Sequence, residues 1–161
     1  PINRLYTQMN KIIKDGELVT PEYEIFESGE AKGSIVPLET FLALTDKSNT
    51  GVWIDAHEEV ETIAAFVQDI PVVALNFPVF ADGRAYSSAN ILRRVCGYTG
   101  EIRAMGDVRI DQLEQMSRCG FNAYALAHGQ DAEKAMGVLI QGFSYSYQAT
   151  VSQPALFALR A

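Results

Sequence analysis

The stretch PVVALNFPVFADGRAYSSANILRRVCGYTGEIRAMGD, residues 71–107, decides the fold. It opens with PVVALNF, an apolar run typical of a buried strand, and closes with GEIRAMGD, which we assign as another strand. Between them, SSANILRRVCG is typical of a helix that ends at Gly97. A strand, a helix and a strand in this order predict a βαβ unit, in which the two strands are parallel.

The same alternation continues on both sides of this stretch. Before it lie the helix pattern PLETFLALTD, the strand GVWID and the helix pattern AHEEVETIAAFVQDI. After it lie the helix pattern VRIDQLEQMSRCG, the strand FNAYAL and a last long helix, DAEKAMGVLIQGFSYSYQ. We therefore predict an α/β fold with a mainly parallel sheet of consecutive βα units, arranged as an open sheet or as a partial barrel.

The first residues follow a different pattern. NKIIKDGELV predicts a β-hairpin that turns at Asp15-Gly16, and TPEYEIFESGEAKG predicts loop or edge structure. We expect a single domain over residues 1–161, with a β and loop segment at 1–34 and the βα core at 35–150.

Composition limits the functional classes. The 161 residues are 48% hydrophobic and 20% charged, as in an ordinary folded protein, and the formal net charge of −7 disfavours nucleic-acid binding. No apolar run approaches the about 20 residues that span a bilayer. The start, PINRLYTQMNKII, lacks the pattern of a secretory signal, so a cytoplasmic protein without membrane contact is expected.

Common cofactor and metal motifs are absent. The two cysteines, Cys96 and Cys119, are far apart, and His57 and His128 lack metal-binding spacing. The sequence has no dinucleotide or phosphate-binding glycine loop and no hydrolase nucleophile elbow. No metal site is expected, and no cofactor is evident.

Parallel sheets place their ligand sites in the loops beyond the carboxyl ends of the strands. These positions hold Asp55, His57, Asn76, Asp82, Arg84, Tyr86, Ser87, Asp107, Arg109 and His128. If the strands are neighbours, these residues converge on one edge of the sheet.

The loop after PVVALNF is the richest in polar groups. Ser87 or Ser88 can cap the following helix, and Arg84 lies beside its start, which together predict a site for a small anion such as phosphate, sulfate or carboxylate. The plainer alternative is a turn at Asp82-Gly83, an Arg84 paired with an acidic neighbour and a serine that only caps the helix.

Candidate catalytic residues are Asp107, Arg84 and Tyr86. Asp107 follows a predicted strand, where a carboxylate can act as a general base or orient a hydroxyl. The structural alternative for Asp107 is a helix N-cap, a position that aspartate favours.

Two further features have alternative interpretations. Cys119, beside Arg118, is either a buried small residue or a reactive thiol, and its surroundings favour the first. The aromatic residues near the end of the last helix indicate packing or a subunit contact, as in a homo-oligomer, more than a cofactor site. They are Phe143, Tyr145 and Tyr147.

The segments FADGRAYSSANILRR and GYTGEIRAMGDVRIDQLEQMSRCGFNAYAL resemble the bacterial domain-of-unknown-function 934 family. Its pattern is F-x-DGRGYS-x-A-x-LLRER-x-GY-x-GELRA-x-GDV-x-x-DQL-x-x-x-x-RCGFDAF, and the correspondence runs from about residue 51 to 148. Ala85 replaces the usual glycine and Asn122 the usual aspartate. The matching residues are Asp82, Gly83, Arg84, Tyr86, Ser87, Leu92, Arg93, Gly97, Gly100, Arg103, Gly106, Asp107, Asp111, Gln112, Leu113, Arg118, Cys119, Gly120 and Phe121.

The resemblance implies a role in assimilatory sulfite reduction, because genes of this family lie beside those of sulfite or nitrite reductase and their products are labelled oxidoreductases. Two functions fit. One is an accessory protein without a redox cofactor, which binds sulfite reductase, its electron donor or an intermediate. The other is an enzyme that acts on a small sulfur-containing or carboxylate substrate at the C-terminal edge of the sheet. A redox protein using Cys119 is a third, weaker possibility.

Overall fold

The computed structural model describes residues 11–25, 32–78 and 83–150, without the side chains of 142–150. The strands are β1 (Ile12–Lys14), β2 (Glu17–Val19), β3 (Glu24–Ile25), β4 (Ser34–Pro37), β5 (Gly51–Ile54), β6 (Val72–Phe77), β7 (Glu101–Gly106) and β8 (Ala123–Tyr124). The helices are α1 (Leu38–Ala43), α2 (Arg84–Arg94), α3 (Leu113–Cys119) and α4 (Ala132–Thr150), with the 3₁₀ helices η2 (Val60–Asp69) and η3 (Ile110–Gln112). The α/β class is thus confirmed.

The eight strands of the described residues join one sheet, in the order β2-β1-β8-β7-β6-β5-β4-β3. Strands β3 to β8 pair in parallel, whereas β1 pairs antiparallel with both β2 and β8. The predicted hairpin is confirmed, and its turn residues Asp15 and Gly16 have positive φ angles of 52° and 82°. The prediction of a mainly parallel sheet was too simple: the hairpin belongs to the same sheet and makes it mixed.

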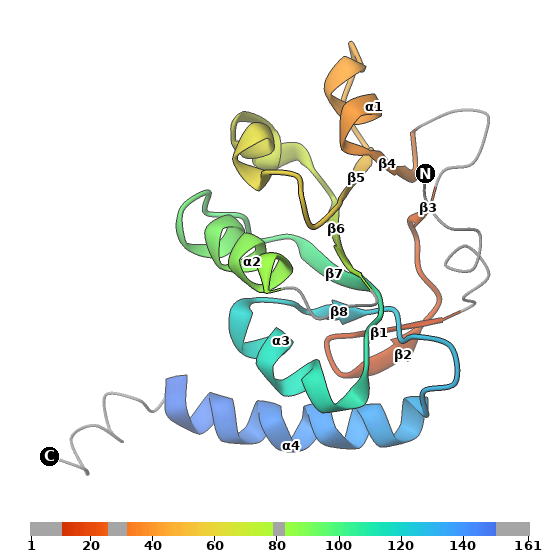
Figure 1. The fold of residues 1–161 in the computed structure, drawn as a ribbon, viewed down its shortest axis with the longest axis vertical. Coiled ribbons are helices and arrows are strands. Elements are labelled where there is room, and N and C mark those ends of the chain that lie inside the picture. The colour runs from red at the N-terminus through yellow and green to blue at the C-terminus, as the bar shows by residue number, and fades with distance from the viewer. Residues whose placement is uncertain (1–10, 26–31, 79–82, 151–161) are drawn as a thin grey trace, which may run out of the picture.

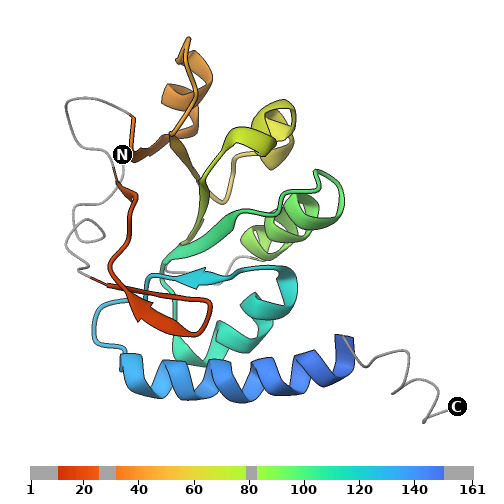
Figure 2. The ribbon, with the colours of Figure 1, turned by 180° about the vertical axis from the view of Figure 1, so that it is seen from behind.

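The sheet curls into a half-barrel, with the helices on its convex side (Figure 1). Strands β2 and β3 lie at opposite ends of the strand order, yet only residues 20–23 connect them. Seven strand spacings of about 4.8 Å would separate them by about 34 Å in a flat sheet. The five steps from Val19 to Glu24 span at most about 18 Å. The sheet must therefore curl, and residues 20–23 pass across its open side (Figure 2).

Apolar side chains are buried on both faces of the sheet. The outer face packs against the helices through residues such as Val52, Val73 and Ile102. The inner, concave face carries a second cluster that includes Trp53, Ala74 and Met105. Burial on both faces explains why β5 and β6 appear in the sequence as nearly continuous apolar runs.

Two local features differ from the prediction. The helix after β5 is the 3₁₀ helix η2, in which Val60 and Ile63 are buried three residues apart, as are Val67 and the C-cap residue Ile70. That spacing suits three residues per turn. The parallel series also begins at β3, before the expected start of the core at residue 35.

Candidate functional site

The carboxyl ends of β5, β6 and β7 meet at one edge of the sheet, because these strands are parallel neighbours. Asp55 follows β5, Asn76 lies near the end of β6, and Asp107 follows β7. Trp53 and Ala74 belong to the inner cluster, so strand alternation directs Asp55 and Asn76 to the inner face as well. The sequence prediction of a shared edge is confirmed for these strands.

Asp55 is held in place by two hydrogen bonds. The Asn76 amide donates from Nδ2 to Asp55 Oδ1 at 2.9 Å, and the Asp55 backbone N–H donates to Glu58 Oε1 at 2.8 Å. The other amide atom, Asn76 Oδ1, is buried without a hydrogen-bond partner. Reversing the amide would set an oxygen against the carboxylate, so this orientation is the favourable one. The Asp55 carboxylate is therefore presented at the inner edge in a defined orientation.

Gly106 makes this arrangement possible. Its φ angle is +94°, and a Cβ at this position would lie 2.3 Å from the Phe77 carbonyl oxygen and 2.4 Å from Asn76 Oδ1. The next residue, Asp107, donates its backbone N–H to the same Phe77 oxygen at 2.8 Å. Any side chain at residue 106 would displace Asn76 or the β6 backbone.

Asp107 is not a helix cap. The 3₁₀ helix η3 begins at Ile110 with Arg109 in the N-cap position, so the structural alternative considered for Asp107 is wrong. Its carboxylate instead pairs with Arg109, with Nε and Oδ1 3.0 Å apart. The Asp107 side chain is 18% exposed and that of Arg109 is 55% exposed. The Asp107 carboxylate is thus partly buried at this edge and bonded to Arg109.

A cleft of about 640 Å³ lies between the segment after β5 and the start of α2. It brings together the three residues predicted to bind an anion, Arg84, Ser87 and Ser88, and adds His57 from the β5 loop. The other lining residues are Ala56, Glu58, Glu59, Glu61 and Gly83. Asp82, also predicted at this edge, lies outside the described residues.

Helix α2 begins earlier than predicted, at Arg84, with Gly83 in the N-cap position. Ser87 therefore lies in the helix, where its N–H donates to Gly83 O at 3.3 Å, and the prediction that Ser87 or Ser88 caps the helix is wrong. The serines were predicted as caps because serine is a preferred N-cap residue, but the backbone already has helical φ and ψ angles at Gly83. The first-turn N–H groups without an acceptor inside α2 belong to Arg84, Ala85 and Tyr86.

The cleft has mixed charge. Arg84 and the start of α2 are positive, whereas Glu58, Glu59 and Glu61 line the other side. The Glu58 carboxylate already accepts the Asp55 N–H. The sequence prediction did not include these glutamates, because AHEEVETIAAFVQDI was interpreted only as a helix pattern.

Tyr86 lies in a different environment from Arg84. Its ring packs edge-to-face on Phe77, with centroids 5.2 Å apart, and it belongs to the margin of the outer core. Burial raises the pKa of the Tyr86 phenol above its ordinary value. The candidate catalytic residues thus occupy three settings at one edge: Arg84 in the cleft, Tyr86 in the outer core and Asp107 beside Arg109.

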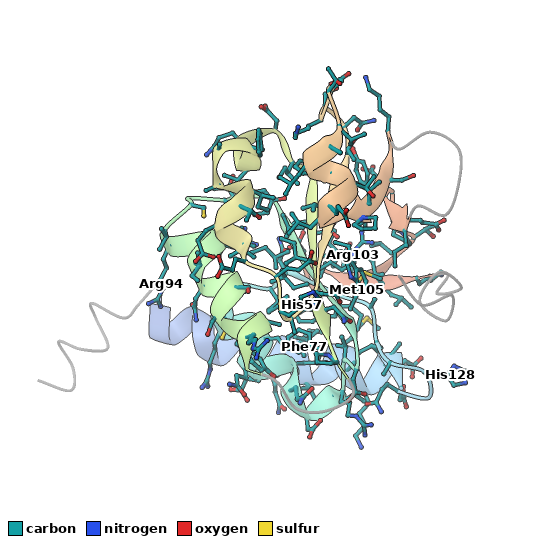
Figure 3. The ribbon with its side chains drawn as sticks, turned by 45° about the horizontal axis from the view of Figure 1, so that its top comes forward. His57, Phe77, Arg94, Arg103, Met105 and His128 are labelled. Carbon is teal, nitrogen blue, oxygen red and sulfur yellow. The ribbon has the colours of Figure 1, made fainter. Side chains whose placement is uncertain are left out.

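His128 does not join this group. Figure 3 shows His128 at the margin of the molecule, well apart from His57. Burial raises the pKa of the Cys119 thiol, which is the opposite of what a reactive thiolate needs. The side chains of Phe143, Tyr145 and Tyr147 lie outside the described part of the chain.

Sequence reasoning also missed an ionic cluster inside the half-barrel. Arg103 donates from Nε to Glu101 Oε2 at 2.7 Å and from Nη1 to Tyr23 O at 2.8 Å, and Lys14 Nζ lies 3.2 Å from Glu101 Oε1. Arg103 and Met105 lie near the centre of the molecule (Figure 3). Strand alternation in GEIRAMGD could have placed Glu101 and Arg103 on one face, opposite Ile102. The cluster ties the connection between β2 and β3 to the middle of the sheet.

Over the described residues, no group of three or more His, Cys, Asp or Glu side chains could hold a metal ion. None of the described helices is both long enough and apolar enough to cross a bilayer.

The curled sheet and the polar groups at its C-terminal edge define an α/β half-barrel protein with its candidate site in the βα loops. Comparison with known families then identifies the chain more closely. It belongs to the family described as bacterial protein of unknown function (DUF934), which matches residues 51–157. No curated protein matches the chain.

Proposed function

We propose that this protein is an accessory protein of assimilatory sulfite reduction that binds a small oxyanion, such as sulfite, in the cleft at the start of α2. One observation carries the anion site: Arg84, Ser87 and Ser88, predicted from sequence alone, line a single cleft together with His57. The resemblance of the sequence to the family pattern supports the pathway. A role in this pathway implies a partner such as sulfite reductase or its electron donor.

The chemistry of the cleft suits an oxyanion at one end. N–H groups without helical acceptors and the positive end of the α2 dipole favour negative charge at Arg84–Tyr86. The guanidinium of Arg84 can add a bidentate pair of hydrogen bonds to a planar or tetrahedral oxyanion. The hydroxyl groups of Ser87 and Ser88, one turn further on, are additional donors.

The glutamates of the cleft oppose anion binding. Glu59 and Glu61 repel a dianion more strongly than a monoanion, because the repulsion scales with ligand charge. We therefore expect modest affinity and a preference for singly charged oxyanions and carboxylates over phosphate dianion. Removing a positive side chain and removing a negative side chain of the cleft should therefore change anion affinity in opposite directions.

Titration calorimetry with sulfite, sulfate and phosphate tests the anion site. Arg84→Ala should abolish sulfite binding, whereas Glu61→Gln should tighten it, because one repulsive charge is removed. Arg94→Ala, at the exposed far end of the same helix, removes an equal charge and is the matched control. If sulfite binds equally to the wild type and to Arg84→Ala, the cleft is not the anion site.

A second experiment tests the pathway. Strains that lack the gene should grow poorly on sulfate as the sulfur source and normally on cysteine, and the purified protein should retain sulfite reductase or its electron donor in a pulldown. Unimpaired growth on sulfate would count against the pathway.

An enzyme is the second candidate function, and the orientation of Asp55 favours it. The Asp55 carboxylate, held by Asn76 at the inner edge, could accept a proton from a small sulfur-containing or carboxylate substrate. Asp107, which follows β7 two strands away at the same edge, is a second candidate base. Turnover of a candidate substrate that is lost in Asp55→Asn and Asp107→Asn, with folding intact, would favour this alternative over a binding role.

A further inference from the structure

A second hollow lies at the opposite edge of the sheet from the cleft lined by Arg84, Ser87 and Ser88, which we call the anion cleft. It has a volume of about 620 Å³ and lies between the tip of the β1–β2 hairpin, the connection from α3 to β8, and helix α4. The side chains that define it are Asp15, Glu17, Phe121, Tyr124, Leu139 and Ile140, and we call it the hairpin groove. In parallel sheets this N-terminal edge is not where catalytic groups gather, so the hairpin groove needs a different explanation.

The floor of the hairpin groove is apolar, and its mouth is exposed. Phe121 and Tyr124 are buried, and Leu139 is 7% exposed on the face of α4 that packs against the core. The next residue, Ile140, is 57% exposed at the groove. Leu139 already makes the contact that the fold requires, so Ile140 adds exposed apolar surface that a bound partner would remove from water.

The charged side chains among the described residues that line the hairpin groove are both acidic, and the guanidinium of Arg93, which donates to the Gly120 carbonyl oxygen, lies beside it. Asp15 and Glu17 are exposed carboxylates on the hairpin, and no Lys or Arg is among the groove-lining residues in the described part of the chain. The chain as a whole carries a formal net charge of −7. A surface complementary to the hairpin groove therefore combines an apolar side chain with a neighbouring cation.

We infer that the hairpin groove receives a segment of a partner protein in which an apolar side chain is flanked by Lys or Arg. The apolar side chain would lie against Phe121 and Ile140, and the cation would lie against Asp15 and Glu17. This inference rests on the proposed accessory role and supplies the contact surface that such a role needs. Because the hairpin groove and the anion cleft lie at opposite edges of the sheet, both can be occupied at once.

Two synthetic peptides test the inference, one with Leu and Phe flanked by Lys and one with Glu in place of every Lys. Calorimetry should show binding of the Lys peptide and at least about tenfold weaker binding of the Glu peptide. Resonances of Leu139 and Ile140 should shift in NMR spectra. Ile140→Asp should weaken Lys-peptide binding by about tenfold or more, whereas Val95→Asp, at a valine that is 77% exposed at the end of α2, should not.

A double variant that removes both carboxylates of the hairpin groove tests whether they bind the cation of the partner segment. Asp15→Asn with Glu17→Gln should weaken binding of the Lys peptide several-fold and reduce its dependence on salt. Asn keeps the hairpin turn, because it accepts the positive φ of residue 15. Glu24→Gln, on β3 at the opposite end of the strand order, removes one exposed charge elsewhere and should have no effect.

Three outcomes would overturn the inference. The Lys peptide could bind Ile140→Asp as tightly as the wild type, or the two peptides could bind the wild type equally. The hexylammonium ion could also bind as tightly as the Lys peptide, which would indicate a small-molecule pocket. Sulfite binding separates this inference from the proposed function. If the wild type binds sulfite but neither peptide, the hairpin groove is not a partner site and the anion cleft is unaffected. If the peptide results hold and sulfite does not bind, the anion site fails alone.

Discussion

Gly106 is the residue on which the inner edge most depends. We predict that Gly106→Ala costs about 1–3 kcal/mol of backbone strain from the positive φ, and more from its contacts with Phe77 and Asn76. Gly129→Ala is the matched control, because residue 129 has a φ of +88° and a Cβ added there would meet no heavy atom within 4 Å. Chemical denaturation should show a larger loss for Gly106→Ala. Equal losses would mean that the contact with Asn76 carries no energy.

Tyr98 links stability to alkaline pH. Its hydroxyl donates to Ile70 O and Glu101 O, and burial raises the pKa of the Tyr98 phenol above its ordinary value, as it does for the Tyr124 phenol. The folded-state pKa is the higher one, so the contribution to stability is complete below the unfolded-state pKa of about 10 and is lost as pH rises beyond it.

We therefore predict that the free energy of unfolding falls as pH rises above about 10, and that tyrosinate absorbance from these two phenols appears only as the fold opens. Tyr98→Phe should reduce this pH dependence. It should also cost about 1–3 kcal/mol at neutral pH, because two buried carbonyl groups lose their donor. Ionisation of every tyrosine in the folded protein near pH 10 would contradict the assignment.

Among the elements, α2 connects the two edges of the sheet. Its first turn lines the anion cleft, and Arg93 near its end donates to three carbonyl oxygens, those of Gly120, Tyr98 and Gly100, at 2.9, 2.9 and 2.8 Å. The family pattern around α2 therefore has two parts. The part at Arg84 belongs to the candidate site, whereas the part at Arg93 and its glycine neighbours stabilises the fold.

The next prediction concerns the buried ion pair between Glu101 and Arg103 on strand β7. Arg103→Met should destabilise the protein by about 3–5 kcal/mol, because Glu101 stays buried with only Lys14 as its cationic partner among the described residues. The double variant Glu101→Leu with Arg103→Met should recover most of this loss, since no uncompensated charge remains. Urea unfolding measures both. If the double variant is as unstable as the single one, the loss comes from packing or from the Tyr23 contact and not from the buried charge.

Across the whole molecule, the features that depend on short stretches of sequence were predictable. The order of strands and helices, the hairpin at Asp15-Gly16 and the shared C-terminal edge follow from periodicity and turn chemistry. Arg84, Ser87 and Ser88 were grouped on the same basis, from a loop between a strand and a helix, and they line one cleft; anion binding there is our proposal.

The features that the sequence did not predict depend on contacts between distant segments. The curl of the sheet follows from the short connection at residues 20–23, which matters only once β2 and β3 are known to lie at opposite ends. The glutamates of the cleft come from a segment before β6 that only the tertiary fold sets against Arg84. The pairing of Asn76 with Asp55 likewise joins residues on separate strands.

The whole molecule therefore presents two opposite edges with different chemistry. The C-terminal edge offers a cleft with Arg84 and the start of a helix, and the N-terminal edge offers an apolar groove with carboxylates beside it. This separation suits an accessory protein that holds a small ligand at one edge and contacts a partner at the other.

An NMR titration of the isotope-labelled protein with sulfite tests the proposed anion site most directly. We predict saturable shifts of the backbone amide resonances of Arg84, Ala85 and Tyr86, with no such shifts in Arg84→Ala. Shifts confined to other parts of the chain, or the same shifts in Arg84→Ala, would contradict an anion site at the start of α2.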